Sequence, residues 1–200
     1  MNIYIHVEIA MRELDNKLLL AVVGASRGHQ ILVSNLNSII EGVRTGVLKP
    51  GVFHTKSLTP TIKKIARHQS LLERGFQVTS IDEEGGMIDH GYDTFAKVRY
   101  SEETLGQASA VFGWGPEDTD TLKRVYSRFS SRIYLTGPPR ADLWRSRFSQ
   151  YWVLPMESRN SPPKAGAKYS VVHHLFAISG FYGTMLTKAS PTPPFPMPQG

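Results

Sequence analysis

Five ionisable side chains fall within ten residues, directly after the first β-rich segment of the chain. They are Glu8, Arg12, Glu13, Asp15 and Lys17. One interpretation is a solvated helix start whose local ion pairs each contribute little to stability. The other is a ligand site, in which Arg12 or Lys17 meets a phosphate at a helix amino terminus while Glu8 or Asp15 holds sugar hydroxyls. The residue pattern alone leaves both interpretations open.

A second group, Asp82-Glu83-Glu84-Gly85-Gly86, follows another β-rich segment. Three consecutive acids repel one another, and they stay together at a cost unless they bind a cation, a base or sugar hydroxyls. The two glycines let the backbone turn sharply and leave room for a ligand. Glu83 and Gly85 are therefore candidate binding residues, and Glu84 is the candidate general base. The alternative is an acidic surface loop.

Two further cations follow strand-like segments. Arg140 lies in TGPPRADL, and an arginine just past a strand can bind a phosphate through two hydrogen bonds. The alternative for that segment is a linker with an ion pair between Arg140 and Asp142. Lys56, in the sequence HTKS, is a weaker phosphate candidate. Together these residues make a sugar phosphate or nucleotide sugar the ligand class to test.

The elements that must position these residues follow from the hydrophobic pattern. Short β-rich runs alternate with segments of helical periodicity six times over about 137 residues. The predicted strands cover residues 2–7, 30–34, 51–54, 77–81, 108–112 and 132–135. Short connections between them predict an α/β fold, with a doubly wound, mostly parallel sheet of six strands covered on both faces. In such sheets ligands bind beyond the carboxyl ends of the strands, where the groups above should meet.

The helical segments carry more detailed predictions. Leu14, Leu18, Leu19 and Val22 recur at helical spacing and should form the buried face of the first helix. The second helix should begin after Asn35, which is a good capping residue. For the third helix, Thr59-Pro60 predicts the start, and Ile62, Ile65, Ala66 and Leu72 predict the apolar face. Residues 87–100 predict a looser stretch.

Composition narrows the functional classes. The chain has no cysteine, which excludes disulfides and thiolate nucleophiles and fits a reducing compartment. Its net charge is +6, but the first 150 residues carry 19 Lys and Arg against 16 Asp and Glu, and no basic cluster is interleaved with aromatics. Nucleic-acid binding is therefore not predicted. The amino terminus lacks the features of a secretory signal, so we expect a cytoplasmic protein.

The last fifty residues differ from the rest. They hold 8 of the 13 prolines, and the final twelve residues cannot form a helix or an interior strand. We therefore predict a domain over residues 1–148 and a proline-rich tail over 149–200 that is disordered or frame-shifted. The apolar run Tyr169–Leu186 is interrupted by His173, His174 and two glycines, so it predicts no firm membrane span.

A glycine motif at Gly24–Gly28 looks like the cofactor loop of dehydrogenases, but here it closes a helix instead of opening one. No Tyr-x-x-x-Lys pair occurs in the chain, so a nicotinamide-dependent oxidoreductase is a remote alternative. His29 and His54 lack metal-ligand spacing to other histidines or acids. The sequence thus predicts neither a cofactor nor a metal.

Six fragments together resemble a known family. They are IYIHVEIAMRELDNKLLLA, the RGH before residue 30, KSLTP at 56–60, DEEGG at 82–86, FGWG at 112–115 and TGPPRADLWR at 136–145. In order and spacing over residues 2–148, they resemble the amino-terminal half of bacterial surface carbohydrate biosynthesis proteins. That family is related in architecture to glycosyltransferases with two Rossmann-type domains.

The resemblance implies a Rossmann-like domain that binds mainly acceptor, facing a second domain that binds the nucleotide-sugar donor. Catalysis in that class needs both domains. The chain departs from the family pattern at Pro138, where asparagine is usual, and it shows no second domain. We therefore expect a glycosyltransferase-like domain of polysaccharide biosynthesis that is incomplete for catalysis. The alternative is a non-catalytic domain that binds a sugar phosphate or a partner, and it predicts an exposed apolar face and homo-oligomers.

Overall fold

The computed structural model describes residues 1–85 and 91–152, with side chains described as far as residue 149. The chain divides into two units, Met1–Ala141 and the part from Asp142 onward, and the first unit contains the whole sheet. The helix α7 (Pro139–Asp142) spans the boundary, and the short 3-10 helix η2 (Ser146–Trp152) follows it. The tail predicted for residues 149–200 lies outside the described residues from 153 onward.

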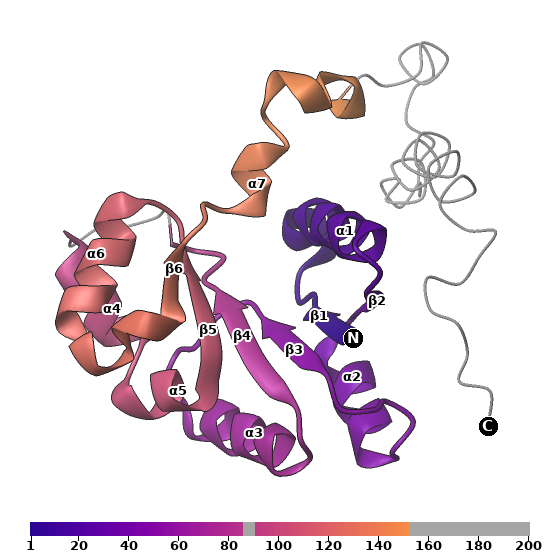
Figure 1. Ribbon diagram of the computed structural model, residues 1–200, viewed down its shortest axis with the longest axis horizontal. Coiled ribbons are helices and arrows are strands. Elements are labelled where there is room, and N and C mark those ends of the chain that lie inside the picture. The colour runs from indigo at the N-terminus through magenta and orange to yellow at the C-terminus, as the bar shows by residue number, and fades with distance from the viewer. Residues whose placement is uncertain (86–90, 153–200) are drawn as a thin grey trace, which may run out of the picture. The chain divides into compact units, whose positions relative to one another are not determined.

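Six parallel strands form a single sheet (Figure 1). They are β1 (Asn2–His6), β2 (Gln30–Ser34), β3 (Val52–Thr55), β4 (Gln77–Ile81), β5 (Ala108–Gly113) and β6 (Ile133–Leu135). Their order is β2-β1-β3-β4-β5-β6, and every neighbouring pair is parallel. This confirms the predicted doubly wound α/β fold. The order reverses direction between β1 and β3, which is the switch point where ligands bind in such sheets.

The helices connect the strands in turn. They are α1 (Ala10–Ser26), α2 (Leu36–Arg44), α3 (Ile62–Glu73), α4 (Gly91–Arg99), α5 (Glu102–Gln107), α6 (Pro116–Val125) and the 3-10 helix η1 (Ser127–Arg132). Because β2 lies on the opposite side of β1 from β3, the right-handed crossovers place α1 on one face of the sheet and the later helices on the other. Figure 1 shows α1 apart from α2, α3 and α5 in this way.

The main core lies between the sheet and the later helices. Tyr4, Phe53, Val78 and Ala108 are register partners on neighbouring strands, so their side chains share one face of the sheet, and all are buried. Two clusters cover that face. The first comprises Tyr4, Ile39, Val43, Phe53, Leu71 and Phe76, and the second is built around Leu58, Val78, Leu105, Val111, Leu122 and Ile133. This packing holds β1, β3 and β4 in register and so aligns their carboxyl ends.

Local capping follows the sequence in part. The side chain of Asn35 accepts a hydrogen bond from the Ser38 amide, as predicted. The start predicted at Thr59 is wrong by two residues, because Thr61 is the capping residue of α3. The predicted face of α3 is also wrong in part, since Ile62 and Ala66 are exposed. The stretch predicted to be loose contains α4, whose Ala96 packs in the core.

The first helix reverses the expected pattern. Its leucines and valines are only partly buried or exposed, whereas Glu13, Asn16 and Lys17 are buried. The prediction that Leu14, Leu18, Leu19 and Val22 form the buried face is therefore wrong. The polar side chains turn inward because they pair with charged groups at the ends of β3 and β4. The apolar side of α1 is left without full cover within the described residues.

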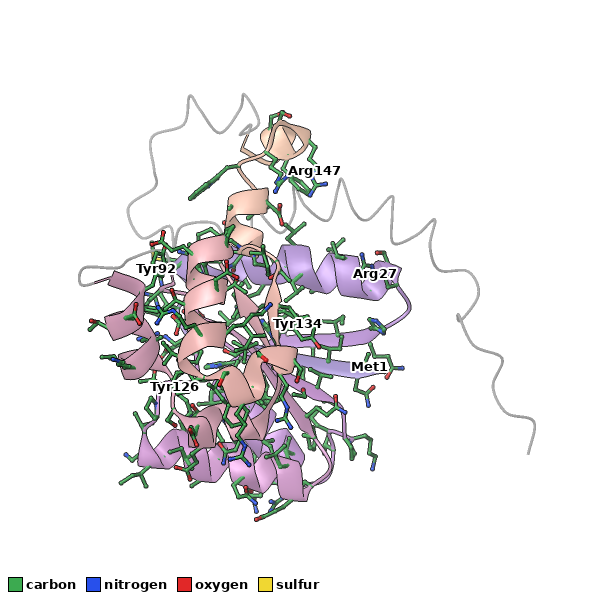
Figure 2. All side chains as sticks on the ribbon, turned by 60° about the vertical axis from the view of Figure 1, so that its left-hand side comes forward. Met1, Arg27, Tyr92, Tyr126, Tyr134 and Arg147 are labelled. Carbon is green, nitrogen blue, oxygen red and sulfur yellow. The ribbon has the colours of Figure 1, made fainter. Side chains whose placement is uncertain are left out.

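Part of the sheet face that α1 adjoins is also open. The rings of His54, Phe112 and Tyr134 follow one another across β3, β5 and β6, with centroids 6.2 and 6.1 Å apart. Tyr134, labelled in Figure 2, is 47% exposed. Among the described residues, apolar groups thus reach solvent both on α1 and on this face.

Candidate functional site

The charged residues singled out in the sequence meet at the carboxyl edge of the sheet. Glu8 lies two residues beyond the end of β1, Lys56 directly follows β3, and Asp82 directly follows β4. These three strands are neighbours in the order β1-β3-β4, so their ends lie together beside the switch point. The first two turns of α1 bring further ionisable groups to the same place.

A buried pair holds the centre of this group. The ammonium of Lys17 pairs with the carboxylate of Glu83, and the two side chains are 2% and 5% exposed. Glu83 also accepts a hydrogen bond from the side-chain amide of Asn16 at 3.0 Å and pairs with the guanidinium of Arg140 at 3.1 Å. One carboxylate therefore joins α1, the β4 loop and the segment after β6. The buried ammonium of Lys17 thus contacts Glu83 within the interior.

Glu13 organises the amino terminus of α1 in the same way. Its fully buried carboxylate accepts a hydrogen bond from the Glu8 amide at 2.9 Å and lies 3.1 Å from the Arg12 guanidinium. Lys56 reaches it at 3.9 Å and pairs more closely with the exposed carboxylate of Glu8. The Lys56 pair holds the pKa of Glu8 below its usual value. The ends of β1 and β3 are thereby tied together by ion pairs.

The acidic loop after β4 is held by an arginine that the sequence pattern did not single out. Arg99, at the end of α4, pairs through two nitrogens with Asp82, at 2.8 and 2.9 Å. A third nitrogen of Arg99 lies 3.0 Å from Glu84, and Arg12 lies 3.9 Å from the other oxygen of Glu84. Two guanidinium groups thus flank Glu84, the residue predicted as general base. The side chain of Glu84 is 34% exposed.

Trp114 fixes this loop from the end of β5. Its indole nitrogen donates to the Asp82 carbonyl, and its backbone amide donates to the carboxylate of Asp118 at 2.9 Å. Burial raises the pKa of Asp118. A Cβ on Gly85 would lie 2.5 Å from the indole ring, so this glycine allows Trp114 to pack closely. Two fragments of the family resemblance, DEEGG and FGWG, are therefore in direct contact.

The predicted site residues separate into buried and accessible groups. Glu13, Lys17 and Glu83 lie in the interior and hold the others in place. The accessible members, with side chains between 19% and 51% exposed, are Glu8, Arg12, Lys56, Glu84 and Arg140. Asp15 is half-buried on α1 and forms no ion pair or hydrogen bond within the described part of the chain. Gly86 lies outside the described residues.

Two of these residues depart from the simplest reading of the sequence. Arg140 pairs with Glu83 and donates to the Arg12 carbonyl at 3.2 Å, while Asp142 pairs with Arg145 at 2.7 Å. The ion pair expected for a linker between Arg140 and Asp142 is replaced by these two.

Asn16 and Arg99 belong to the network but were not among the site residues predicted from the sequence. The basic end of α4 was the available signal for Arg99, but it lay in the stretch predicted to be loose.

Three buried histidines lie beneath the site. His6 stacks at 6.3 Å on Phe53, which in turn contacts His68 at 6.2 Å. Burial lowers the pKa of His6 and of His68 to about 4, and that of His54 to about 3. All three are therefore neutral near pH 7. No group of three potential ligands suited to a metal ion occurs in the described ranges.

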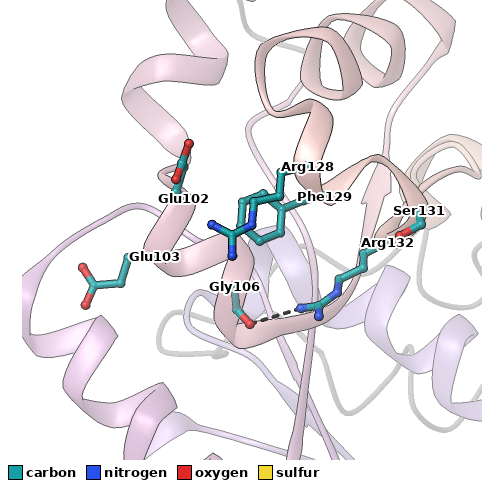
Figure 3. A pocket seen from close by; sticks show the side chains of 7 residues that line it. All are labelled: Glu102, Glu103, Gly106, Arg128, Phe129, Ser131 and Arg132. Carbon is teal, nitrogen blue, oxygen red and sulfur yellow. Dashed lines mark hydrogen bonds between the residues drawn. The ribbon is translucent and has the colours of Figure 1, made fainter.

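A hollow of about 540 Å³ lies elsewhere, between α5 and η1 (Figure 3). It is lined by Glu102, Glu103, Gly106, Arg128, Phe129, Ser131 and Arg132. Because α5 and η1 precede β5 and β6, the hollow lies at the amino edge of the sheet. Arg132 there donates to the carbonyls of Gly106 and Ala108 at 3.1 and 3.0 Å, which is a structural role. The charge network at the carboxyl edge of the sheet is therefore a stronger candidate for the ligand-binding site than this hollow.

In the part of the chain that the structure describes, no helix combines the length and apolar character needed to cross a membrane. No family model, curated protein or solved structure matches the chain.

Proposed function

We propose that this chain is a glycosyltransferase-like domain of bacterial surface carbohydrate biosynthesis that binds a sugar phosphate or nucleotide sugar at the carboxyl edge of its sheet. The observation that carries the proposal is the layered charge network at the switch point. Buried Glu13, Lys17 and Glu83 fix a rim of accessible cations and carboxylates. A sugar phosphate needs both kinds of group, since guanidinium and ammonium groups bind phosphate and carboxylates accept from hydroxyls.

The accessible carboxylates and cations of the rim suit different parts of a sugar phosphate. Glu8 and Glu84 are the accessible carboxylates, with side chains 51% and 34% exposed, and so are the ones that can accept a hydrogen bond from a sugar hydroxyl. Arg12 lies 3.9 Å from Glu84, and Arg140 donates to the Arg12 carbonyl; their side chains are 35% and 26% exposed. In this proposal Glu84 assists the acceptor hydroxyl. The cations stabilise the negative charge that develops on a leaving phosphate.

Titration calorimetry with hexose 1-phosphates and nucleoside diphosphate sugars tests the proposal. We expect Glu84→Gln and Arg12→Ala each to weaken binding about tenfold or more, which corresponds to about 1.4 kcal/mol. Arg128→Ala at the hollow on the amino edge is the matched control and should leave the affinity unchanged. Unchanged affinity in both site variants would rule out this placement of the ligand.

A specific observation favours a second candidate, a non-catalytic domain completed by a partner or by another copy. Met11 on α1 is 85% exposed, and Tyr134 is 47% exposed on the open sheet face. Exposed apolar groups of this kind favour association. Light scattering distinguishes the candidates, because a clean monomer at all protein concentrations counts against association.

A further inference from the structure

The amino-terminal half of α3 carries two partly buried cations that the network does not neutralise, besides the exposed Lys63. Lys64 and Arg67 are both partly buried, and neither forms an ion pair with a carboxylate among the described residues. By contrast, the other cations near this edge are matched. Lys56 pairs with Glu8, Lys17 and Arg140 share Glu83, Arg12 pairs with Glu13, and Arg99 pairs with Asp82 and Glu84.

Three features make this pair unfavourable in the free protein. Lys64 and Arg67 are three residues apart in α3, so they lie on the same helix face and repel each other. Both lie near the amino terminus of the helix, where the macrodipole disfavours positive charge. Both are partly desolvated, and the buried Nε of Arg67 has no hydrogen-bond partner. An anion bound between them would offset all three costs.

The surroundings place this pair beside the candidate site. The ammonium of Lys64 donates to the hydroxyl of Ser57 at 2.6 Å, in the loop that follows β3 and Lys56. Burial, followed by the charges of Arg67 and Arg99, lowers the pKa of Lys64 to about 8, so cations from two helices act on it. Lys56 acts in the same direction, and Asp82 opposes it. The cation pair therefore adjoins the ends of β3 and β4.

We infer that Lys64 and Arg67 form a phosphate-binding subsite, with the hydroxyl of Ser57 as a third polar group. A phosphate monoester carries two negative charges near neutral pH, which matches the two unpaired cations. An arginine beside a lysine suits such a ligand, since the guanidinium can donate two parallel hydrogen bonds while the ammonium acts as a compact charge. Phosphate binding at this subsite does not depend on the proposed function. Only the presence of a sugar on the bound phosphate rests on it.

Inorganic phosphate is the probe that tests the subsite by itself. Thermal unfolding and titration calorimetry would compare the wild type with Lys64→Met and Arg67→Met, at matched ionic strength with chloride as the reference anion. The matched controls are Lys63→Met and Arg74→Met, which alter exposed cations of the same helix region. We expect phosphate to raise the unfolding temperature of the wild type and of both controls. Its affinity should fall at least tenfold in the Lys64 and Arg67 variants.

A second readout separates loss of binding from loss of folding. Because each substitution removes a repelling charge, the phosphate-free Lys64→Met protein should unfold at a higher temperature than the wild type. A lower unfolding temperature, or equal phosphate affinity in all five proteins, or no phosphate binding by the wild type, would overturn the inference. Sugar phosphates that bind no more tightly than inorganic phosphate contradict the proposed function and leave the phosphate subsite standing.

Discussion

Lys17 and Glu83 form an ion pair in which both side chains are almost completely buried, joining the first helix to the loop after β4. Breaking such a pair on one side leaves an uncompensated charge in the interior. We expect Lys17→Met to lower the free energy of unfolding by about 3 kcal/mol, measured by urea denaturation. The exposed pair between Arg44 and Glu41 supplies the control, since Arg44→Met should leave the free energy of unfolding nearly unchanged.

The double variant Lys17→Met with Glu83→Met distinguishes a charge effect from a packing effect. If the buried charge causes the loss, removing both partners costs less than the sum of the two single substitutions. Additive losses would contradict the coupling that the structure assigns to these side chains. Glu83 also contacts Asn16 and Arg140, so some loss persists in the double variant.

The buried histidines predict acid sensitivity. In the unfolded chain the pKa of histidine is near 6.5, whereas in the folded protein burial lowers the pKa of His6 and His68 to about 4 and that of His54 to about 3. Between these pH values the unfolded state binds more protons than the folded state. The contribution of the neutral histidines to the free energy of unfolding is therefore fully present above pH 6.5. It falls as the pH drops from about 6.5 towards 4 and continues to fall towards 3.

We expect His68→Gln to reduce this pH dependence, with denaturation followed at pH 7 and at pH 5. Each pKa unit of difference corresponds to about 1.4 kcal/mol, so the slope should be readily measured. His29 lies between α1 and β2 and is less buried than His68, so His29→Gln serves as the control. An unchanged pH dependence in the His68 variant would show that its ring is not held neutral by burial.

Gly85 predicts a steric effect on the neighbouring loop. A Cβ at this position would lie 2.5 and 2.7 Å from two atoms of the Trp114 indole, so Gly85→Ala must displace the ring. We expect a loss of about 1–3 kcal/mol, as for overpacking, together with a change in tryptophan fluorescence. Gly106→Ala is the control, since its Cβ would meet only Phe129 at 3.8 Å or more. A neutral Gly85 variant would contradict the close packing.

Lys64 should be unusually reactive towards amine reagents. With a pKa of about 8, about half of its side chains are unprotonated at pH 8, whereas an ordinary lysine is almost fully protonated. Reductive methylation followed by peptide mass spectrometry should modify Lys64 faster than other partly buried lysines. Saturating phosphate should slow the reaction. Slow modification in the absence of phosphate would place the pKa of Lys64 near that of an ordinary lysine.

Sequence reasoning recovered the strands and the meeting of the charged groups because both follow from local patterns. Short β-rich runs specify a parallel sheet, and in such a sheet the ends of β1, β3 and β4 must lie together. It failed on α1, where apolar periodicity pointed to Leu14 and Leu18 although Asn16 and Lys17 are buried. That inversion depends on Glu83, which is 66 residues from Lys17 in the chain. No local pattern reveals such a partner.

We propose above that a ligand binds at the carboxyl edge of the sheet. Amide chemical-shift mapping by NMR during titration with a hexose 1-phosphate tests it most directly. We expect the largest shifts to cluster at Glu8, Arg12, Lys56, Glu84 and the first turns of α3. Shifts that cluster instead at the hollow between α5 and η1, or no shifts at saturating ligand, would contradict it.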